Sequence, residues 1–319
     1  MKPRVFITRI PPAPVLAALR ERFDLTCPDS DVPMEPAAIV RAAEGCAGLV
    51  TMLNDRIDVE EFDGMPDLKV IANYAAGVNN INLEAARDRG LVVTNTPGVL
   101  TEATADLSFA LLLAVARRII EGDAFVRSGR WQGWGPTMLL GMELTGARLG
   151  IVGMGRIGSA VARRARGFGM EVLYHNRTRL PEDAEQKLGV RYSALDALLE
   201  SADVISLHCP LTPETHHLID ADAFARMKHG ALFINTGRGE VVDEAALIDA
   251  LESGKLGGAG LDVFDGEPAV NPRLLEFPDV VLAPHVGSAT GETRTRMGLM
   301  VADNLSAFFA GDEPPNRVV

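Results

Sequence analysis

Short runs of β-branched and apolar residues alternate with amphipathic stretches along almost the whole chain. Each apolar run ends in a glycine or a polar turn, and a helical pattern follows before the next run begins. This alternation is typical of parallel sheets with crossover helices, so we expect two α/β domains, each a doubly wound parallel sheet. In the first hundred residues we expect strands at 4–8, 48–52, 69–72 and 91–94, with helices opening near Pro12, Glu35 and Asn82.

The pattern changes after residue 96, where Pro97 and Gly98 interrupt it. Thr101 is a suitable N-cap for the long apolar helix that follows, whose segment 107–116 is too short to span a bilayer. From residue 148 we expect six further strands, at 149–152, 171–174, 204–207, 231–235, 260–263 and 280–283, as in a dinucleotide-binding fold. A helix at 291–309 follows a complete sheet and should return to the first domain, with 312–319 as a loop.

A glycine fingerprint follows the first strand of this second series. Gly153, Gly155 and Gly158 give the spacing GxGxxG, directly after an apolar run and directly before a helical pattern. In a dinucleotide site the first glycine allows the tight turn, the second admits the pyrophosphate, and the third lets helix and strand pack closely. A glycine-rich turn without a ligand can also have this spacing, but the flanking strand and helix favour a cofactor site.

The end of the next strand bears on which dinucleotide is bound. An NAD site usually places Asp or Glu about 20 residues after the fingerprint, whereas this chain has Asn176, Arg177, Thr178 and Arg179 there. Two guanidinium groups with amide and hydroxyl donors suit a 2′-phosphate. We therefore expect NADP to be preferred, with NAD bound at lower affinity; the alternative is that the arginines are solvated on a surface loop.

Three polar side chains follow three later strands. Arg238 lies in NTGRG, Glu267 in DGEP and His285 in APHVGSAT. The carboxyl ends of parallel strands meet at one edge of a sheet, so we expect the three side chains to lie close together. A guanidinium suits a planar carboxylate, an imidazole exchanges protons near neutral pH, and a neighbouring carboxylate favours the protonated imidazole. Beside a dinucleotide site, the trio indicates a reductase for 2-keto acids.

Composition and charge narrow the function classes. Of the 319 residues, 47% are hydrophobic and 23% are charged, as in a soluble globular protein of two domains. The formal net charge of −12 disfavours nucleic acid or an anionic membrane as the main partner. The N-terminal apolar run is too short for a signal peptide, so we expect a cytoplasmic protein.

Metal binding is not expected from the remaining candidate ligands. His216 and His217 are adjacent but have no ligand spacing that demands a metal, and His208 lies at a strand end where it could line the cofactor site. The cysteines are odd in number and lack CxxC spacing, which argues against disulfides and structural zinc. They are Cys27, Cys46 and Cys209.

Several segments together resemble one family, the D-isomer-specific 2-hydroxyacid dehydrogenases. They are the glycine fingerprint, HCPLTPETHHLI, NTGRG, GLDVFDGEP and APHVGSAT. Within that family, VIANYAAGVNNIN, VTNTPGVLTEATADL and the Arg177 region most resemble the glyoxylate and hydroxypyruvate reductases. The resemblance implies a flavodoxin-like substrate domain (1–98 plus 288–319), a Rossmann dinucleotide-binding domain (99–287) and a cleft between them.

The resemblance also implies roles for individual residues. Arg238 would hold the substrate carboxylate and polarise the keto oxygen, His285 would be the acid in reduction and the base in oxidation, and Glu267 would pair with His285. Leu53 and the backbone amides of Ala76 and Gly77 would contact the substrate. Beyond the three glycines and residues 176–178, cofactor contacts are implied for Thr104, Arg156, Ile157, Cys209, Thr215, Thr236, Gly237 and Asp262.

A loop at 129–146 is rich in glycine, tryptophan and methionine. Its aromatic residues could serve a subunit contact or a lid, or the loop could pack on its own domain. Residues 131–140 resemble the segment that reaches a neighbouring subunit in this family. We therefore expect a homodimer.

Glyoxylate is the expected substrate and hydroxypyruvate the next, while another 2-keto acid stays open because a few side chains decide the preference. A 3-phosphoglycerate dehydrogenase is disfavoured, since such enzymes usually carry Arg where this chain has Asn73 and many have an added regulatory domain. The family also includes dinucleotide-sensing corepressors in which the trio can survive. The trio alone therefore does not distinguish an enzyme from a sensor.

Overall fold

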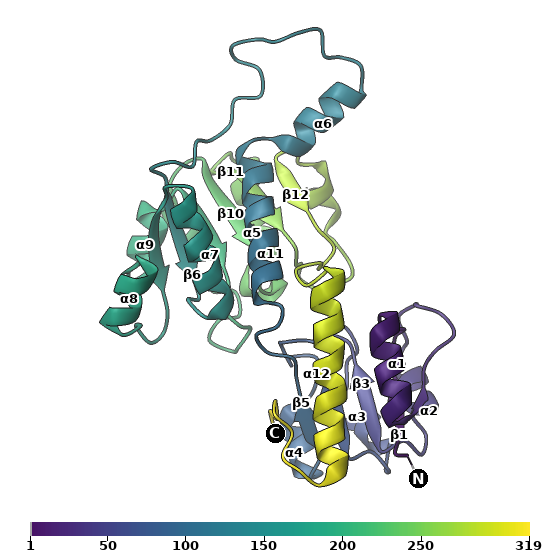
Figure 1. The fold of residues 1–319 in the computed structure, drawn as a ribbon. Coiled ribbons are helices and arrows are strands. Elements are labelled where there is room, and N and C mark those ends of the chain that lie inside the picture. The colour runs from purple at the N-terminus through teal and green to yellow at the C-terminus, as the bar shows by residue number, and fades with distance from the viewer. Residues whose placement is uncertain (1) are drawn as a thin grey trace. The chain divides into compact units, whose positions relative to one another are not determined.

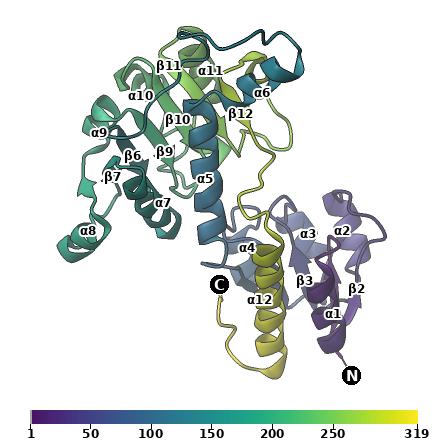
Figure 2. The same cartoon turned by 45° about the horizontal axis from the view of Figure 1, so that its top comes forward.

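The computed structural model describes residues 2–319 and divides them into two compact units. The smaller unit comprises the chain up to Leu100 together with Ser288–Val319, and the larger unit comprises Thr101–Gly287. Each unit is built on one sheet whose neighbouring strands are all parallel, with helices on both faces (Figures 1 and 2). The expected fold class is confirmed.

The sheet of the smaller unit has the strand order β2-β1-β3-β4-β5. One face packs against α2, α3 and α4 and the other against α1 and α12; Phe6 points to the first face while Val5 and Ile7 point to the second, as strand alternation requires. The strands are β1 (Arg4–Ile7), β2 (Asp24–Thr26), β3 (Gly48–Thr51), β4 (Val70–Asn73) and β5 (Val92–Thr94); the helices are α1 (Ala13–Arg22), α2 (Pro36–Ala42), α3 (Val59–Asp63), α4 (Leu83–Asp88) and α12 (Gly291–Ala310).

The sheet of the larger unit has the order β12-β11-β10-β9-β6-β7-β8. Helices α5 and α7 cover one face, and α9, α10 and α11 cover the other. The strands are β6 (Arg148–Val152), β7 (Glu171–His175), β8 (Arg191–Tyr192), β9 (Val204–Leu207), β10 (Ala231–Asn235), β11 (Leu256–Leu261) and β12 (Val280–Leu282); the helices are α5 (Thr101–Ala116), α6 (Ile119–Arg127), α7 (Arg156–Gly167), α8 (Glu182–Leu188), α9 (Leu195–Ser201), α10 (Ala221–Arg226) and α11 (Glu244–Glu252).

The strand order of the larger sheet reverses between β6 and β9. From β6 the chain builds outward through β7 and β8 on one side, and from β9 through β10, β11 and β12 on the other. In open α/β sheets, ligands bind outside the carboxyl ends of the strands at such a reversal. The fold therefore directs attention to the loops that follow β6 and β9.

Four expectations from the sequence need correction. The larger sheet has seven strands rather than six; the additional one is the two-residue edge strand β8. In the smaller sheet, β2 was not expected because it is short and contains no fully buried residue. Strand β11 begins at Leu256, before 260; a Cβ on Gly257 would lie 2.6 Å from the carbonyl oxygen of Gly230, so glycine is used there for close packing. Thr101 is the first residue of α5 rather than its N-cap.

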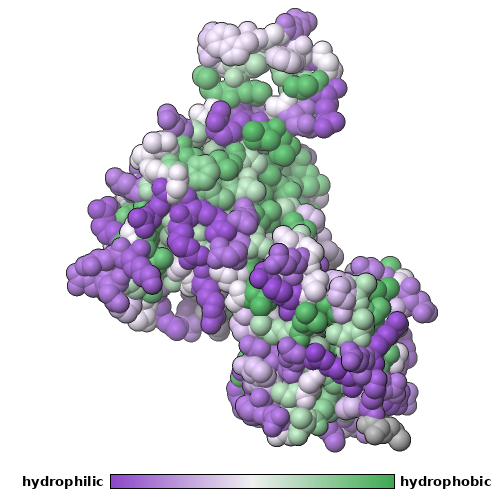
Figure 3. All heavy atoms as spheres, viewed as in Figure 1, coloured by the Kyte–Doolittle hydropathy of each residue, from purple (hydrophilic) through white to green (hydrophobic). Residues whose placement is uncertain are grey.

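The segment between α6 and β6 forms no helix or strand and extends outward from the larger unit (Figures 1 and 2). Trp134 is 82% exposed, so this tryptophan does not pack on its own unit. Apolar side chains gather around α6 and this loop in the space-filling view (Figure 3). The exposed members are Ile119, Ile120, Val126, Trp131, Trp134, Met138 and Leu140.

Among residues 2–319, no helix has the length and apolar character needed to cross a membrane.

Candidate active site

The three glycines of the fingerprint each meet a different spatial demand. Gly153 follows β6 with φ at +100°, and a Cβ there would lie 2.4 Å from the backbone nitrogen of Cys209. A Cβ on Gly158 would lie 2.3 Å from the carbonyl oxygen of Gly153, whereas a Cβ on Gly155 would meet no heavy atom within 4 Å. The turn is thus closed on the protein side and open at Gly155, the N-cap of α7, as pyrophosphate binding requires.

His208 follows β9 on the other side of the strand reversal. Burial lowers the pKa of its imidazole to about 4, so the ring is neutral at physiological pH. Its Nε2 lies 2.8 Å from the Ser206 hydroxyl, while its buried Nδ1 has no hydrogen-bond partner in residues 2–319. An unsatisfied buried polar atom next to the glycine turn is consistent with a site that a polar ligand completes.

The four polar residues after β7, residues 176–179, differ in their hydrogen bonds and in their exposure. Asn176 accepts a hydrogen bond from the backbone N–H of Met154 at 2.6 Å, so its side chain supports the glycine turn. Arg179 donates two hydrogen bonds of 2.8 Å to Glu185, and this pairing with help from Tyr174 holds the pKa of Glu185 at about 2. Arg179 is therefore engaged, which corrects the expectation that both arginines would be available to a 2′-phosphate. Arg177 and Thr178 are exposed.

The other residues expected to contact the cofactor lie in loops at the carboxyl edge of the same sheet or on α5 and α7. Thr104 on α5 donates to the carbonyl oxygen of Gly287 at 3.2 Å, and Thr236 pairs with the Ser108 hydroxyl at 2.8 Å. Burial raises the pKa of the Cys209 thiol to about 11, so this cysteine stays protonated. Arg156 and Ile157 begin α7, Gly237 follows β10, and Thr215 uses its hydroxyl within its own loop.

Glu267 and His285 are in direct contact. The Nδ1 atom of His285 lies 2.7 Å from Oε2 of Glu267, and Oε1 of Glu267 accepts a hydrogen bond from the Phe264 N–H at 2.9 Å. His285 has φ at +53°, an unusual backbone conformation for a residue other than glycine. Strain of this kind persists only where surrounding contacts impose it, and it is often found at functional sites.

Charge ties Arg238 to this pair. Burial alone would raise the pKa of Glu267, but the hydrogen bond from His285 and the charges of His285 and Arg238 outweigh it, so the pKa lies below its ordinary value. Burial lowers the pKa of Arg238, while the charges of Glu267 and Glu240 oppose that shift. The arrangement therefore provides an ionised carboxylate, a half-buried imidazole and a cation within one unit.

Asp262 has a role in this loop that sequence reasoning did not reveal. Its carboxylate is 1% exposed and accepts the N–H groups of Val286 and Gly287 at 2.7 and 2.9 Å, while its carbonyl oxygen accepts the His285 N–H at 2.9 Å. Burial raises the pKa of Asp262 above its ordinary value. These three bonds hold the backbone around His285 in its unusual conformation.

Leu53 and the backbone amides of Ala76 and Gly77, which are expected to contact the substrate, lie in the smaller unit. Leu53 is half-buried after β3, and Ala76 and Gly77 are half-buried after β4. These two strands are neighbours in the sheet, and the backbone N–H of Tyr74 donates to the carbonyl oxygen of Thr51 at 2.8 Å. Both loops therefore begin at the carboxyl edge of that sheet.

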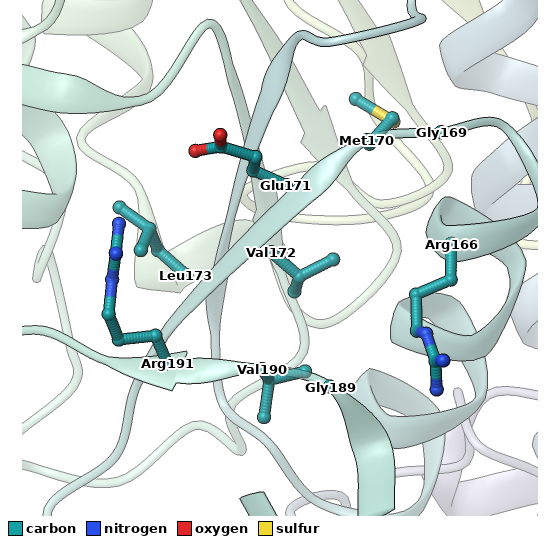
Figure 4. A pocket seen from close by; sticks show the side chains of 9 residues that line it. All are labelled: Arg166, Gly169, Met170, Glu171, Val172, Leu173, Gly189, Val190 and Arg191. Atoms are coloured by element: carbon teal, nitrogen blue, oxygen red, sulfur yellow. The ribbon is translucent and has the colours of Figure 1, made fainter. Parts of the chain in front are cut away.

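A cavity of about 500 Å³ lies elsewhere in the larger unit, at the amino end of β7 (Figure 4). Its lining includes Arg166 and Arg191, which stand on opposite sides of it in Figure 4. Arg166 donates to the carbonyl oxygen of Leu188 at 3.3 Å, at the end of α8. Because parallel sheets bind ligands at their carboxyl ends, this cavity is not the candidate site.

The larger unit also matches a known sequence family. Residues 109–287 match the NAD-binding domain of the D-isomer specific 2-hydroxyacid dehydrogenases. A glyoxylate reductase of Korarchaeum cryptofilum is 52% identical over 320 residues, which cover 100% of this chain and 96% of that protein. The chain belongs to the D-isomer specific 2-hydroxyacid dehydrogenase family. The expected family membership is confirmed, and the larger unit is its NAD(P)-binding domain.

Solved structures extend the match to the fold of the whole chain. A protein from Thermus thermophilus shares 51% identity at a TM-score of 0.92, covering 99% of this chain and 100% of that one. The NADPH-dependent glyoxylate/hydroxypyruvate reductase of Sinorhizobium meliloti, solved with NADP and malonate, shares 36% identity at a TM-score of 0.89, covering 100% and 97%. The chain thus resembles dehydrogenases of this family over its full length.

The role of the glycine turn can be tested by adding a methyl group at either of two glycines of α7. Gly158→Ala places a Cβ against the Gly153 carbonyl oxygen, and we expect it to destabilise the larger unit by about 3 kcal/mol and to weaken NADPH binding. Gly167→Ala, at the other end of α7, meets no heavy atom within 4 Å and should leave both within about 1 kcal/mol of wild type. Thermal melts and NADPH titrations compare the two; wild-type NADPH affinity in Gly158→Ala would contradict the assignment.

Proposed function

We propose that the protein reduces glyoxylate, and also hydroxypyruvate, to the corresponding 2-hydroxy acid with NADPH as the hydride donor. The observation that carries this proposal is the contact between His285 and Glu267 at the carboxyl edge of a dinucleotide-binding sheet, with the charge of Arg238 acting on the same carboxylate. The 52% identical glyoxylate reductase supports the choice of substrate.

The reaction converts a keto acid, a hydride and a proton into a hydroxy acid. The glycine turn after β6 would hold a reduced nicotinamide dinucleotide, which would supply the hydride for the carbonyl carbon. His285, whose Nδ1 faces Glu267, has Nε2 left to donate the proton to the carbonyl oxygen, and the reverse reaction returns the proton to it. Glu267 is ionised at working pH because its pKa is lowered, so it stabilises the imidazolium that this step needs.

Arg238 contributes a fixed positive charge. Its backbone carbonyl accepts a hydrogen bond from the Asn235 side chain at 2.9 Å, which anchors the turn after β10. We assign its guanidinium to the substrate carboxylate and to the oxygen on which negative charge develops. The backbone amides of Ala76 and Gly77 are assigned to the carboxylate as well, and Leu53 to the wall of the substrate site.

NADP is proposed as the preferred cofactor, with Arg177 and Thr178 binding the 2′-phosphate. Arg179 is engaged by Glu185, so Arg177 is the other cation at the end of β7; its charge also acts on the Glu214 carboxylate. No carboxylate stands at residues 175–179 to favour the ribose hydroxyls of NAD. The S. meliloti reductase, which is NADPH-dependent, supports the choice.

A homodimer is proposed as the working form. Its support is the cluster of exposed apolar residues on α6 and the following loop, with Trp131 and Trp134 being 52% and 82% exposed. Exposed aromatic residues that cluster on a protruding loop are typical of subunit contacts.

A kinetic panel tests the reaction and its cofactor together. The wild-type protein should reduce glyoxylate with a lower KM for NADPH than for NADH. Arg177→Ala should raise the KM for NADPH about tenfold and leave that for NADH unchanged, because only NADPH carries the 2′-phosphate. Arg179→Ala is the matched control and should not discriminate between the cofactors. An NADH preference in wild type would refute the cofactor assignment; cofactor binding without turnover would favour a dinucleotide sensor.

The dimer is tested by sedimentation over a range of protein concentrations. Trp134→Ser should weaken self-association at least about tenfold, because a large exposed aromatic side chain at an interface often contributes strongly to affinity. The exposed Leu275→Ser, which lies outside the α6 and loop cluster, should leave self-association unchanged. A wild-type protein that stays monomeric at micromolar concentration would remove the proposal.

A further inference from the structure

The loop after β4 presents three successive backbone N–H groups without acceptors. Within residues 2–319, the N–H groups of Ala76, Gly77 and Val78 donate no hydrogen bond, although all three residues are half-buried. Unpaired N–H groups in a partly buried loop are costly unless a ligand or water accepts from them, and successive ones form an anion-binding concavity. The direction of these N–H groups depends on the carbonyl groups of the same peptide units.

Each of the three preceding carbonyl oxygens is held by a specific donor. The Ala75 oxygen accepts from the Thr96 N–H at 2.9 Å, the Ala76 oxygen from the Asn95 side chain at 2.7 Å, and the Gly77 oxygen from the Asn73 side chain at 2.8 Å. A trans peptide is planar, so its C=O and the next N–H point in opposite directions. Fixing these three oxygens turns the N–H groups of residues 76–78 the other way.

We infer that Asn95 and Asn73 are positioning residues for the substrate carboxylate. Asn95 orients the Gly77 N–H through the Ala76 carbonyl, and Asn73 orients the Val78 N–H through the Gly77 carbonyl. Neither side chain touches the substrate. The inference rests on the proposed function, in which the Ala76 and Gly77 amides bind the carboxylate, and it adds Val78 as a third donor.

Asn95 is itself anchored by the C-terminal part of the chain. Its carbonyl oxygen accepts from the side chain of Asn304 on α12 at 3.2 Å, and its N–H donates to the Asn316 carbonyl oxygen at 3.2 Å. Asn304 is completely buried, and its side-chain oxygen also accepts from the Asn316 side chain at 3.0 Å. The return of the C-terminal helix to the smaller unit thus supports the loop that carries the amide donors.

Asn73 uses its hydrogen-bonding capacity inside the protein. It is completely buried, its oxygen accepts from the Thr51 hydroxyl at 2.9 Å, and its amide nitrogen also donates to the Asn80 side-chain oxygen at 3.1 Å. Asn80 in turn donates to the carbonyl oxygens of Met52 and Asp55, at 3.0 and 3.1 Å. The same network therefore holds the loop after β3, on which Leu53 lies, against the loop after β4.

The decisive variant is Asn95→Ala, which removes one donor from a half-buried side chain and leaves the Ala76 carbonyl free to turn. We expect the KM for glyoxylate and for hydroxypyruvate to rise by the same factor of about ten, because both substrates share the carboxylate. The dissociation constant for NADPH should not change, since the glycine fingerprint belongs to the other unit. Asn73→Ala should behave alike if it folds.

Asn82→Ala is the matched control in the same unit. It removes the N-cap of α4, where the Asn82 side chain accepts from the Ala85 N–H at 3.0 Å, and should lower the melting temperature without changing either KM. An unchanged KM in folded Asn95→Ala, or an equal rise in Asn82→Ala, would overturn the inference.

Oxalate binding to the NADPH-loaded protein separates this inference from the proposed reaction. Weaker oxalate binding by Asn95→Ala, measured by calorimetry, is expected whether or not glyoxylate is turned over. Absent turnover with that loss of oxalate affinity would refute only the proposed reaction. Equal oxalate affinity in wild type and Asn95→Ala, or no oxalate binding by wild type, would refute the positioning role.

Discussion

Every strand in both sheets runs parallel to its neighbours, and this constraint places most of the candidate functional groups. Parallel strands bring their carboxyl ends to one edge, so loops far apart in sequence become neighbours there. In the larger unit this edge carries the glycine turn after β6, the polar segment after β7, His208 after β9 and Arg238 after β10. A hydrogen-bonded pair such as Glu267 and His285 can form because β11 and β12 end side by side.

The loops at this edge are held by buried polar contacts rather than by apolar packing. Asp262 accepts the N–H groups of Val286 and Gly287 and keeps the backbone of His285 in a left-handed conformation. In the smaller unit, the side chains of Asn73 and Asn95 donate to backbone carbonyl oxygens of the loop after β4. Fully paired polar groups of this kind are costly to disturb, because each broken bond leaves a buried group unsatisfied. The fold thus holds these loops with hydrogen bonds from Asp262, Asn73 and Asn95.

Much of this could be predicted from the sequence, because its signals are local. Apolar runs between turns predict the strands, the glycine spacing predicts the cofactor turn, and the strand ends predict where Arg238, Glu267 and His285 lie. What could not be predicted depends on which side chains pair in the folded chain, even when they are only a few residues apart. The residues next to Arg179 in the sequence do not indicate that the Glu185 carboxylate accepts hydrogen bonds from its guanidinium. Strands β2 and β8, of three and two residues, are too short for a periodic signal. The short helix α3 was not expected either, although the sequence contains its capping box, formed by Asp58 and Glu61.

The ionised Glu267 carboxylate, 2.7 Å from Nδ1 of His285, stabilises the imidazolium that donates the proton in the proposed reduction. The most direct test is the pH dependence of kcat/KM for glyoxylate with NADPH in wild type and in Glu267→Gln. The wild-type rate should fall at high pH, because the reduction needs a protonated general acid. The neutral amide no longer stabilises the imidazolium, so in Glu267→Gln the high-pH decline should begin at a lower pH than in wild type. High-pH declines that superimpose in the two proteins would contradict the account.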